Sequence, residues 1–279
     1  MTALLLALAS SLAYGSADFL GGVASRGAHV LRVVVIAAPV SLLVEVLIWP
    51  AVGADFAAGA LWWGAASGLA SAAGFALLYR TLAIGPMSVL SPITALVSAA
   101  LPVAVGLLSG ERLGVLAVVG MTLALVAIAI VSGGTDGGDG ARVSRGALVL
   151  AVGAGTAIAV QLICLDRAPD DSGLAALLVG RAVSSAVVVG AAVALRAQLG
   201  SARPSTSAAV AAGALDSLAN FAFLLAVRSG DLAIVAVITA LYPASTVLLA
   251  RAFLGERMGR AQLAGLGLAA AAVSLLAVG

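Results

Sequence analysis

Long, almost uninterrupted apolar runs constrain this chain more than any other feature. Only 9% of its 279 residues are charged, and 63% are hydrophobic. An ordinary soluble domain is about 25% charged, because its surface must face water. The composition therefore excludes a soluble enzyme, a nucleic-acid-binding protein and a disordered chain, and it indicates an integral membrane protein.

The apolar runs have the length of membrane-spanning helices. A bilayer core about 30 Å thick needs roughly 20 apolar residues per helix. Reading the runs between charges, Gly and Pro predicts ten spans, over residues 3–23, 30–50, 58–80, 87–108, 113–132, 146–165, 173–195, 207–227, 232–254 and 260–278. The first run lacks the cationic start of a signal peptide, so we expect it to be a span. The predicted fold class is an all-α integral membrane protein with ten transmembrane helices.

An internal repeat divides the chain into two halves. At a constant offset of 145 residues, GERLG (110–114) matches GERMG (255–259), ITAL (93–96) matches ITAL (238–241), and Gly68, Gly85 and Gly120 match Gly213, Gly230 and Gly265. We therefore expect a first repeat over 1–133, a Gly-rich linker over 134–144 and a second repeat over 145–279. Five spans per half is an odd number, so the two halves are predicted to be inverted in the membrane. Secondary carriers commonly use such repeats, although duplication could also simply enlarge a bundle.

Three segments resemble the EamA-type transporters of the drug/metabolite transporter superfamily. They are YGSADFLGGVASR (14–26), ALDSLANFAFLLAVRSGDLAIV (214–235) and LYPASTVLLARAFLGERMGRAQLAGLGL (241–268). The resemblance implies ten spans, a central cavity formed by spans one to four and six to nine, and small-molecule transport by exchange or proton coupling. One departure is that Ser98 stands where the second half has Pro243, so these two helices are expected to bend differently.

Three acidic residues fall inside predicted spans. A charge at the centre of a span costs about 2.5–3.5 kcal/mol on insertion scales, which makes such residues functional candidates. Asp216 has Asn220 one helical turn later on the same face. It is a proton-coupling candidate, or alternatively an acid that only ties its helix to a neighbour. Glu45 lies one turn from Trp49, which predicts a position at the membrane interface.

Asp18 is the second proton-coupling candidate. It shares one face of the first span with Tyr14, as expected for the wall of a solvated cavity. The alternative is an interfacial acid paired with Arg26 or Arg32.

Hydroxyl and amide side chains supply the other cavity candidates. Ser91, Thr94 and Ser98 share one face of the fourth span, and Thr239 and Tyr242 share a face of the ninth. Gln161 and Asn220 complete the set. These groups suit hydrogen bonding to a polar substrate, and they also suit helix–helix hydrogen bonds.

Prolines and small residues predict how the helices bend and pack. Pro92, Pro102 and Pro243 are candidates for bending or gating, and Pro243 is expected to free the carbonyl of Thr239. Gly64 and Gly68 predict a face for close helix packing. The GER elements, which include Glu111, predict an ion pair, a helix-end cap or a gate.

The leading functional prediction is a secondary carrier for a small metabolite or drug-like molecule such as an amino acid, with alternating access. His29 is the single histidine, and the chain has no P-loop, HExxH or GxSxG motif. We therefore predict no enzyme activity, no metal and no cofactor. The alternatives are a membrane enzyme or lipid-handling protein that uses Asp18 and Asp216, and a ligand sensor without transport. The expected partners are a small molecule, protons and the lipid bilayer, without nucleic acid, for a monomer or a homodimer.

The distribution of arginine predicts the orientation. Ten arginines fall in or beside odd-numbered loops (26, 32, 80, 142, 145, 196, 203, 251, 257 and 260), against four for even-numbered loops (112, 167, 181 and 228). The positive-inside rule then predicts a cell-membrane protein with both termini outside.

Overall fold

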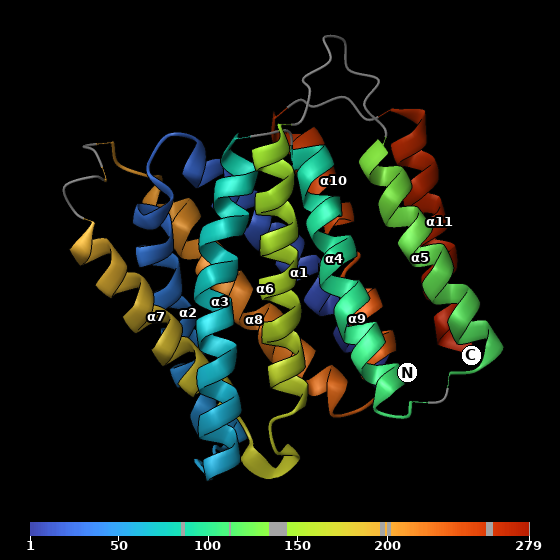
Figure 1. Ribbon diagram of the computed structural model, residues 1–279, viewed down its shortest axis with the longest axis horizontal. Coiled ribbons are helices and arrows are strands. Elements are labelled where there is room, and N and C mark those ends of the chain that lie inside the picture. Colours follow the sequence, from blue (N-terminus) through green and yellow to red (C-terminus); the bar gives the residue numbers. More distant parts are fainter. Residues whose placement is uncertain are drawn as a thin grey trace.

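The computed structural model describes residues 1–84, 87–111, 113–133, 144–195, 199, 202–254 and 259–278. Over these residues the chain is helical, apart from turns and one isolated antiparallel bridge between Ala54 and Gly173. The helices are α1 (Thr2–Arg26), α2 (Val30–Val52), α3 (Ala58–Ile84), α4 (Met87–Leu108), α5 (Val115–Gly133), α6 (Arg145–Asp166), η1 (Asp170–Ser172), α7 (Ala175–Ala194), α8 (Thr206–Val227), α9 (Leu232–Thr239), α10 (Pro243–Leu254) and α11 (Arg260–Val278). Figure 1 shows them as one bundle, with both termini towards its lower end.

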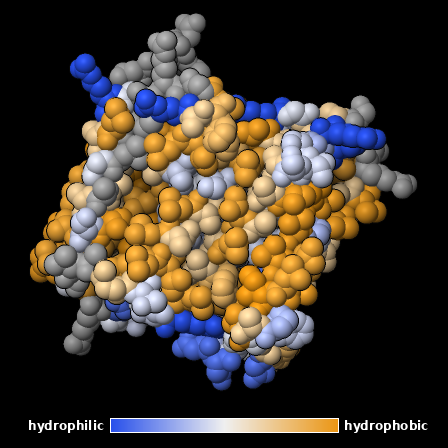
Figure 2. Space-filling view, turned by 180° about the vertical axis from the view of Figure 1, so that it is seen from behind, coloured by the Kyte–Doolittle hydropathy of each residue, from blue (hydrophilic) through white to orange (hydrophobic). Residues whose placement is uncertain are grey.

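Most of the described helices are long and apolar enough to cross a membrane. Seven segments qualify: α1, α2, α3, α6, α7, α8 and the α9–α10 stretch Leu232–Leu254. Shorter apolar stretches lie in α4, α5 and α11, over Ile93–Leu108, Val115–Ile130 and Leu263–Leu276. Figure 2 shows the hydrophobic surface as a broad band, with the strongly hydrophilic residues at its two ends. The protein is a multi-pass membrane protein, as the composition predicts.

The predicted spans agree closely with the helices, with one exception. The span expected over 232–254 is interrupted between α9 and α10. Pro243 has no N–H for the helical ladder, so the backbone tightens before it. Leu241 N donates to Ile238 O at 3.1 Å, and Tyr242 N donates to Thr239 O at 3.2 Å. The prediction that the Thr239 carbonyl is left free is therefore wrong, because the tighter turn satisfies it.

The corresponding helix of the first half is not interrupted. α4 runs continuously from Met87 to Leu108 through Pro92 and Pro102. The helices that carry the repeat-related residues Ser98 and Pro243 therefore differ, as expected: the first is continuous and the second is interrupted.

Glycines let helices of the two halves approach closely. α3 packs on α7 where Gly68 faces Gly180, and a Cβ added at Gly64 would lie 2.7 Å from the Ala176 carbonyl oxygen. The packing face predicted from Gly64 and Gly68 is confirmed. α8 packs on α2 in a similar way, because a Cβ at Gly213 would lie 2.9 Å from the Cα of Ala37.

Candidate functional site

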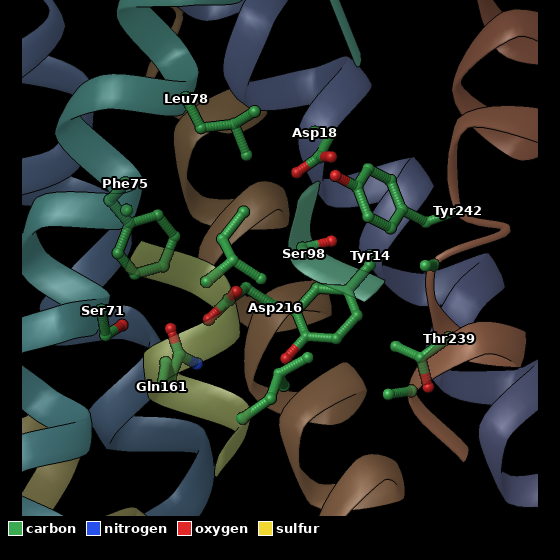
Figure 3. Close-up of a pocket in the computed structure, with 15 residues that line it drawn as sticks. Tyr14, Asp18, Ser71, Phe75, Leu78, Ser98, Gln161, Asp216, Thr239 and Tyr242 are labelled. Carbon is green, nitrogen blue, oxygen red and sulfur yellow. The ribbon is translucent and has the colours of Figure 1, made fainter. Parts of the chain in front are cut away.

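A cavity with about 540 Å³ of empty space lies in the middle of the bundle. It is lined by Tyr14, Asp18, Ser71, Gly74, Phe75, Leu78, Ser98, Ile158, Gln161, Leu162, Asp216, Ala236, Thr239, Ala240 and Tyr242. Figure 3 shows how the polar members lie around it. Seven of these lining residues are among the sequence-predicted candidates: Tyr14, Asp18, Ser98, Gln161, Asp216, Thr239 and Tyr242.

The interruption between α9 and α10 forms one wall of this cavity. Thr239, Ala240 and Tyr242 lie at or within the break and line the cavity. Interrupted backbone is tolerated at membrane depth where it is buried in protein or lines a polar cavity. Pro243 therefore positions cavity residues, although it does not line the cavity itself.

An ionic cluster of Arg181, Glu45 and Asp216 lies beside the cavity. Arg181 Nη2 is 2.6 Å from Asp216 Oδ2, and its Nε is 3.3 Å from Glu45 Oε1. Arg181 Nη1 also donates to Ser71 Oγ at 2.9 Å. All three charged residues are buried, with relative exposures of 2% for Arg181, 0% for Glu45 and 7% for Asp216. One cation thus contacts two carboxylates inside the apolar bundle.

Two expectations are corrected by this cluster. Glu45 does not lie at the membrane interface, because α2 packs against α7 and α8 and buries it completely. Arg181 does not belong to a loop, since it lies inside α7. The sequence could have indicated both positions. A charge inside a span is costly, which predicts that Glu45 and Arg181 each have a buried partner of opposite charge.

Asp216 is also held by hydrogen bonds. Its carboxylate accepts from Ser41 Oγ and from Asn220 Nδ2, each at 3.4 Å. Gln161 Nε2 donates to Asn220 Oδ1 at 2.6 Å and extends the network from α8 to α6. Asn220 is fully buried and lies outside the main cavity, beside a smaller hollow next to Arg181.

Asp18 has a different environment. It is 6% exposed and lines the cavity, and it has no hydrogen bond or ion pair with any residue that the structure describes. The alternative pairing of Asp18 with Arg26 or Arg32 is not found. Figure 3 shows the Tyr242 hydroxyl pointing towards the Asp18 carboxylate. The hydroxyls of Tyr14, Thr239 and Tyr242 are buried without hydrogen-bond partners in the described part of the chain.

Two candidates on α4 lie away from the cavity. Thr94 Oγ1 donates to the carbonyls of Leu90 at 3.1 Å and of Ala151 on α6 at 3.3 Å. Thr94 thus follows the second interpretation of the hydroxyl groups, in which they form hydrogen bonds between helices. Ser91 is fully buried and does not line the cavity. The side chain of Pro92 is outside the described residues, as are the linker residues 134–143, Arg112 and most of GERMG.

Glu111 connects the two halves at the end of the bundle that carries the termini. Its two carboxylate oxygens accept from Leu232 N at 2.9 Å and Ala233 N at 3.0 Å. Both N–H groups belong to the first turn of α9, where a carboxylate is favourable. The predicted helix-end cap is confirmed, and it acts on a helix of the opposite half.

A second set of contacts lies at the same end. Arg228 Nη2 donates to Pro169 O at 3.3 Å and Ser172 Oγ at 3.2 Å. The carbonyl of Ser172 accepts from Asp55 N at 3.0 Å. Burial lowers the pKa of Arg228, and the nearby carboxylate of Asp170 opposes that shift. We call these contacts, together with those of Glu111, the terminal-end latch.

Membrane-length helices surround a buried cavity, and one of them is interrupted beside it, a combination that many secondary transporters share. Residues 145–278 match the model of the EamA-like transporter family, which lies within the drug/metabolite transporter superfamily. The resemblance detected in the sequence is therefore confirmed. A solved structure described as "Crystal structure of protein" superposes with a TM-score of 0.73 at 15% identity, over 99% of this chain and 96% of that chain. At this identity it supports the fold alone. No curated protein matches the sequence.

Proposed function

We propose that this protein is a secondary carrier that moves a small molecule through the central cavity by alternating access. The observation that carries this proposal is a cavity lined by both halves of a chain whose second half matches the model of a transporter family. Polar groups without partners, such as the Tyr14 and Thr239 hydroxyls, provide hydrogen-bonding sites for a substrate.

The helix packing supports ten spans arranged as two inverted repeats. α1 packs on α8, and the equivalent pair with the halves exchanged is α6 on α3. The packing of α2 on α8 has its counterpart in the packing of α7 on α3. In the same way, the packing of α1 on α10 has its counterpart in the packing of α6 on α4. The last helices of the halves, α5 and α11, pack on each other. A two-fold axis in the membrane plane would relate these pairs, as in other carriers with inverted repeats.

Alternating access requires a gate at each end of the cavity. We assign the terminal-end latch to the gate at the end that carries the termini. Its contacts join the α2–α3, α6–α7 and α8–α9 connections and place Glu111 of the first half against α9 of the second. Opening this end requires these contacts to separate, which gives the carrier a state closed on this side.

Proton coupling or exchange would use the buried acids. Asp216 is already compensated by Arg181, whereas Asp18 has no cation partner in the described residues. We therefore favour Asp18 over Asp216 as the group that exchanges a proton or cation during the cycle.

The arginine distribution supports an orientation with both termini outside the cell. Because Arg181 is buried in α7, the even-numbered loops keep three of the four arginines first assigned to them: 112, 167 and 228. The excess of cations at the opposite end is thus larger than the sequence suggested.

Flux across vesicles tests the proposed function. Purified protein is reconstituted, and uptake of amino acids, amines and sugars is compared with uptake by protein-free vesicles and by a Ser98→Trp variant that fills the cavity. Saturable uptake lost in this variant supports a carrier. Chemical turnover of a lipid without a gradient would instead support the membrane-enzyme alternative, and ligand binding without flux would support a sensor.

A further inference from the structure

The charges around the cavity are distributed unequally. The Arg181 guanidinium faces two carboxylates, Glu45 at 3.3 Å and Asp216 at 2.6 Å. Its face also lies over the Phe75 ring, 5.6 Å from the centroid. A carboxylate on a substrate would have to displace one of these buried acids to reach the guanidinium. Arg181, the cation that the described residues place beside the cavity, is therefore a poor site for an anion.

The opposite holds for Asp18. Its carboxylate is buried and lines the cavity, and no described residue compensates it. An isolated buried carboxylate is costly unless a cation or a proton neutralises it. A cation or a proton that enters the cavity would therefore neutralise the Asp18 carboxylate.

Two tyrosine rings line the same cavity as this carboxylate. The centroids of Tyr14 and Tyr242 are 6.4 Å apart, with ring planes at 58°. Tilted aromatic faces attract a nearby cation, and the effect grows when water is excluded. The unpartnered hydroxyls of Tyr14, Tyr242 and Thr239 add acceptors for N–H groups.

Several other residues of the wall are apolar. Phe75, Leu78, Ile158 and Leu162 line the cavity, and Figure 3 shows Phe75 and Leu78 on the far side of the space from Tyr242, with Ser71 and Gln161 near Phe75. Such a wall suits the hydrocarbon body of a ligand, because burying apolar surface is favourable.

We propose that the cavity selects a small organic cation, with an ammonium group held by Asp18, Tyr14 and Tyr242 and an apolar body against the wall formed by Phe75 and Leu78. This inference rests on the proposed carrier function and names its substrate class. Protonation of Asp18 takes the place of the ligand when the site is empty.

Three probes with the same body and different heads test the inference: 2-phenylethylammonium, 2-phenylethanol and 3-phenylpropanoate. Binding is measured as the rise in thermal unfolding midpoint of the purified protein, since a ligand of the folded state stabilises it. The ammonium probe is expected to raise the midpoint, and the neutral and anionic probes are not. Asp18→Asn should weaken the affinity for the ammonium about 10- to 100-fold.

Matched variants separate binding from folding. Asp18→Glu keeps the charge and should retain a substantial part of the affinity, and Asp171→Asn, an exposed acid in η1 away from the cavity, should leave it unchanged. The inference is overturned if the anion stabilises the protein as strongly as the ammonium, if Asp18→Asn binds the ammonium normally, or if ammonium probes with bodies from methyl to naphthyl all leave the midpoint unchanged.

Vesicle flux with the same probes distinguishes this inference from the proposed function. Uptake of the anionic probe without the ammonium would refute the substrate class and leave the carrier standing. Binding of the ammonium that depends on Asp18, without any flux, would uphold the cation site and refute the carrier.

Discussion

The Arg181 guanidinium on α7 lies 2.6 Å from the Asp216 carboxylate on α8, and both side chains are buried in an apolar bundle. Neither charge can be accommodated there alone. Glu45 on α2 completes the cluster, so three helices from both halves of the chain are held together by one cluster of ion pairs. The cluster also removes Arg181 from the groups available to a substrate.

Removal of Arg181 is expected to destabilise the protein strongly. Arg181→Met leaves two buried carboxylates without a cation, and breaking a buried pair in this way costs about 3–5 kcal/mol. Unfolding of the purified protein by heat or SDS measures the effect. The double variant Arg181→Met/Asp216→Asn should lose less stability than the sum of the single variants, and strict additivity would contradict the pairing.

The repeat-related glycines are expected to tolerate no side chain. A Cβ at Gly68 would collide with the Gly180 carbonyl, and a Cβ at Gly213 would collide with the Ala37 carbonyl. Gly68→Ala and Gly213→Ala should each cost about 1–3 kcal/mol through overpacking. Gly190→Ala is the control, because nothing lies within 4 Å of its Cβ. Equal stability of all three variants would refute the close packing.

The Glu111 cap is expected to stabilise the start of α9. Glu111→Ala removes the acceptor of two backbone N–H groups and should cost about 0.5–2 kcal/mol. Asp231 precedes the same helix but makes no side-chain cap bond, so Asp231→Asn should be close to neutral. Thermal unfolding of both variants provides the comparison, and a larger loss in Asp231→Asn would show that the cap is misassigned.

The proposed orientation predicts opposite labelling of the two ends. Cys164 is buried, so a Cys164→Ala background leaves a single introduced thiol. Ser229 is exposed in the α8–α9 connection, and His29 is exposed in the α1–α2 connection. Figure 1 shows the first connection at the end with the termini and the second at the other end, so the thiols are introduced as Ser229→Cys and His29→Cys. An impermeant maleimide added to intact cells should label Ser229→Cys and spare His29→Cys. The reverse pattern would place the termini inside.

The membrane-spanning segments could be predicted because hydropathy is local. The expected spans 30–50, 146–165 and 207–227 differ by at most two residues from Val30–Val52, Arg145–Asp166 and Thr206–Val227. A run of apolar residues forms a helix in a bilayer whatever its neighbours are, because its backbone must satisfy its own hydrogen bonds. Polar residues within such runs likewise indicated the cavity, and Tyr14, Asp18 and Asp216 line it.

The partners of those polar residues were decided by the tertiary structure. Glu45 and Arg181 are 136 positions apart, and Glu111 caps a helix 121 positions later. Thr94 looked equivalent to Thr239, its match in the repeat, yet Thr94 bonds to α6 and Thr239 faces the cavity. The sequence by itself determined which segments form long apolar helices and that charged and hydroxyl groups lie within them. Which of these groups compensate one another, and which are left for a ligand, depends on how helices distant in sequence pack, because ion pairs and hydrogen bonds act only over a few ångströms.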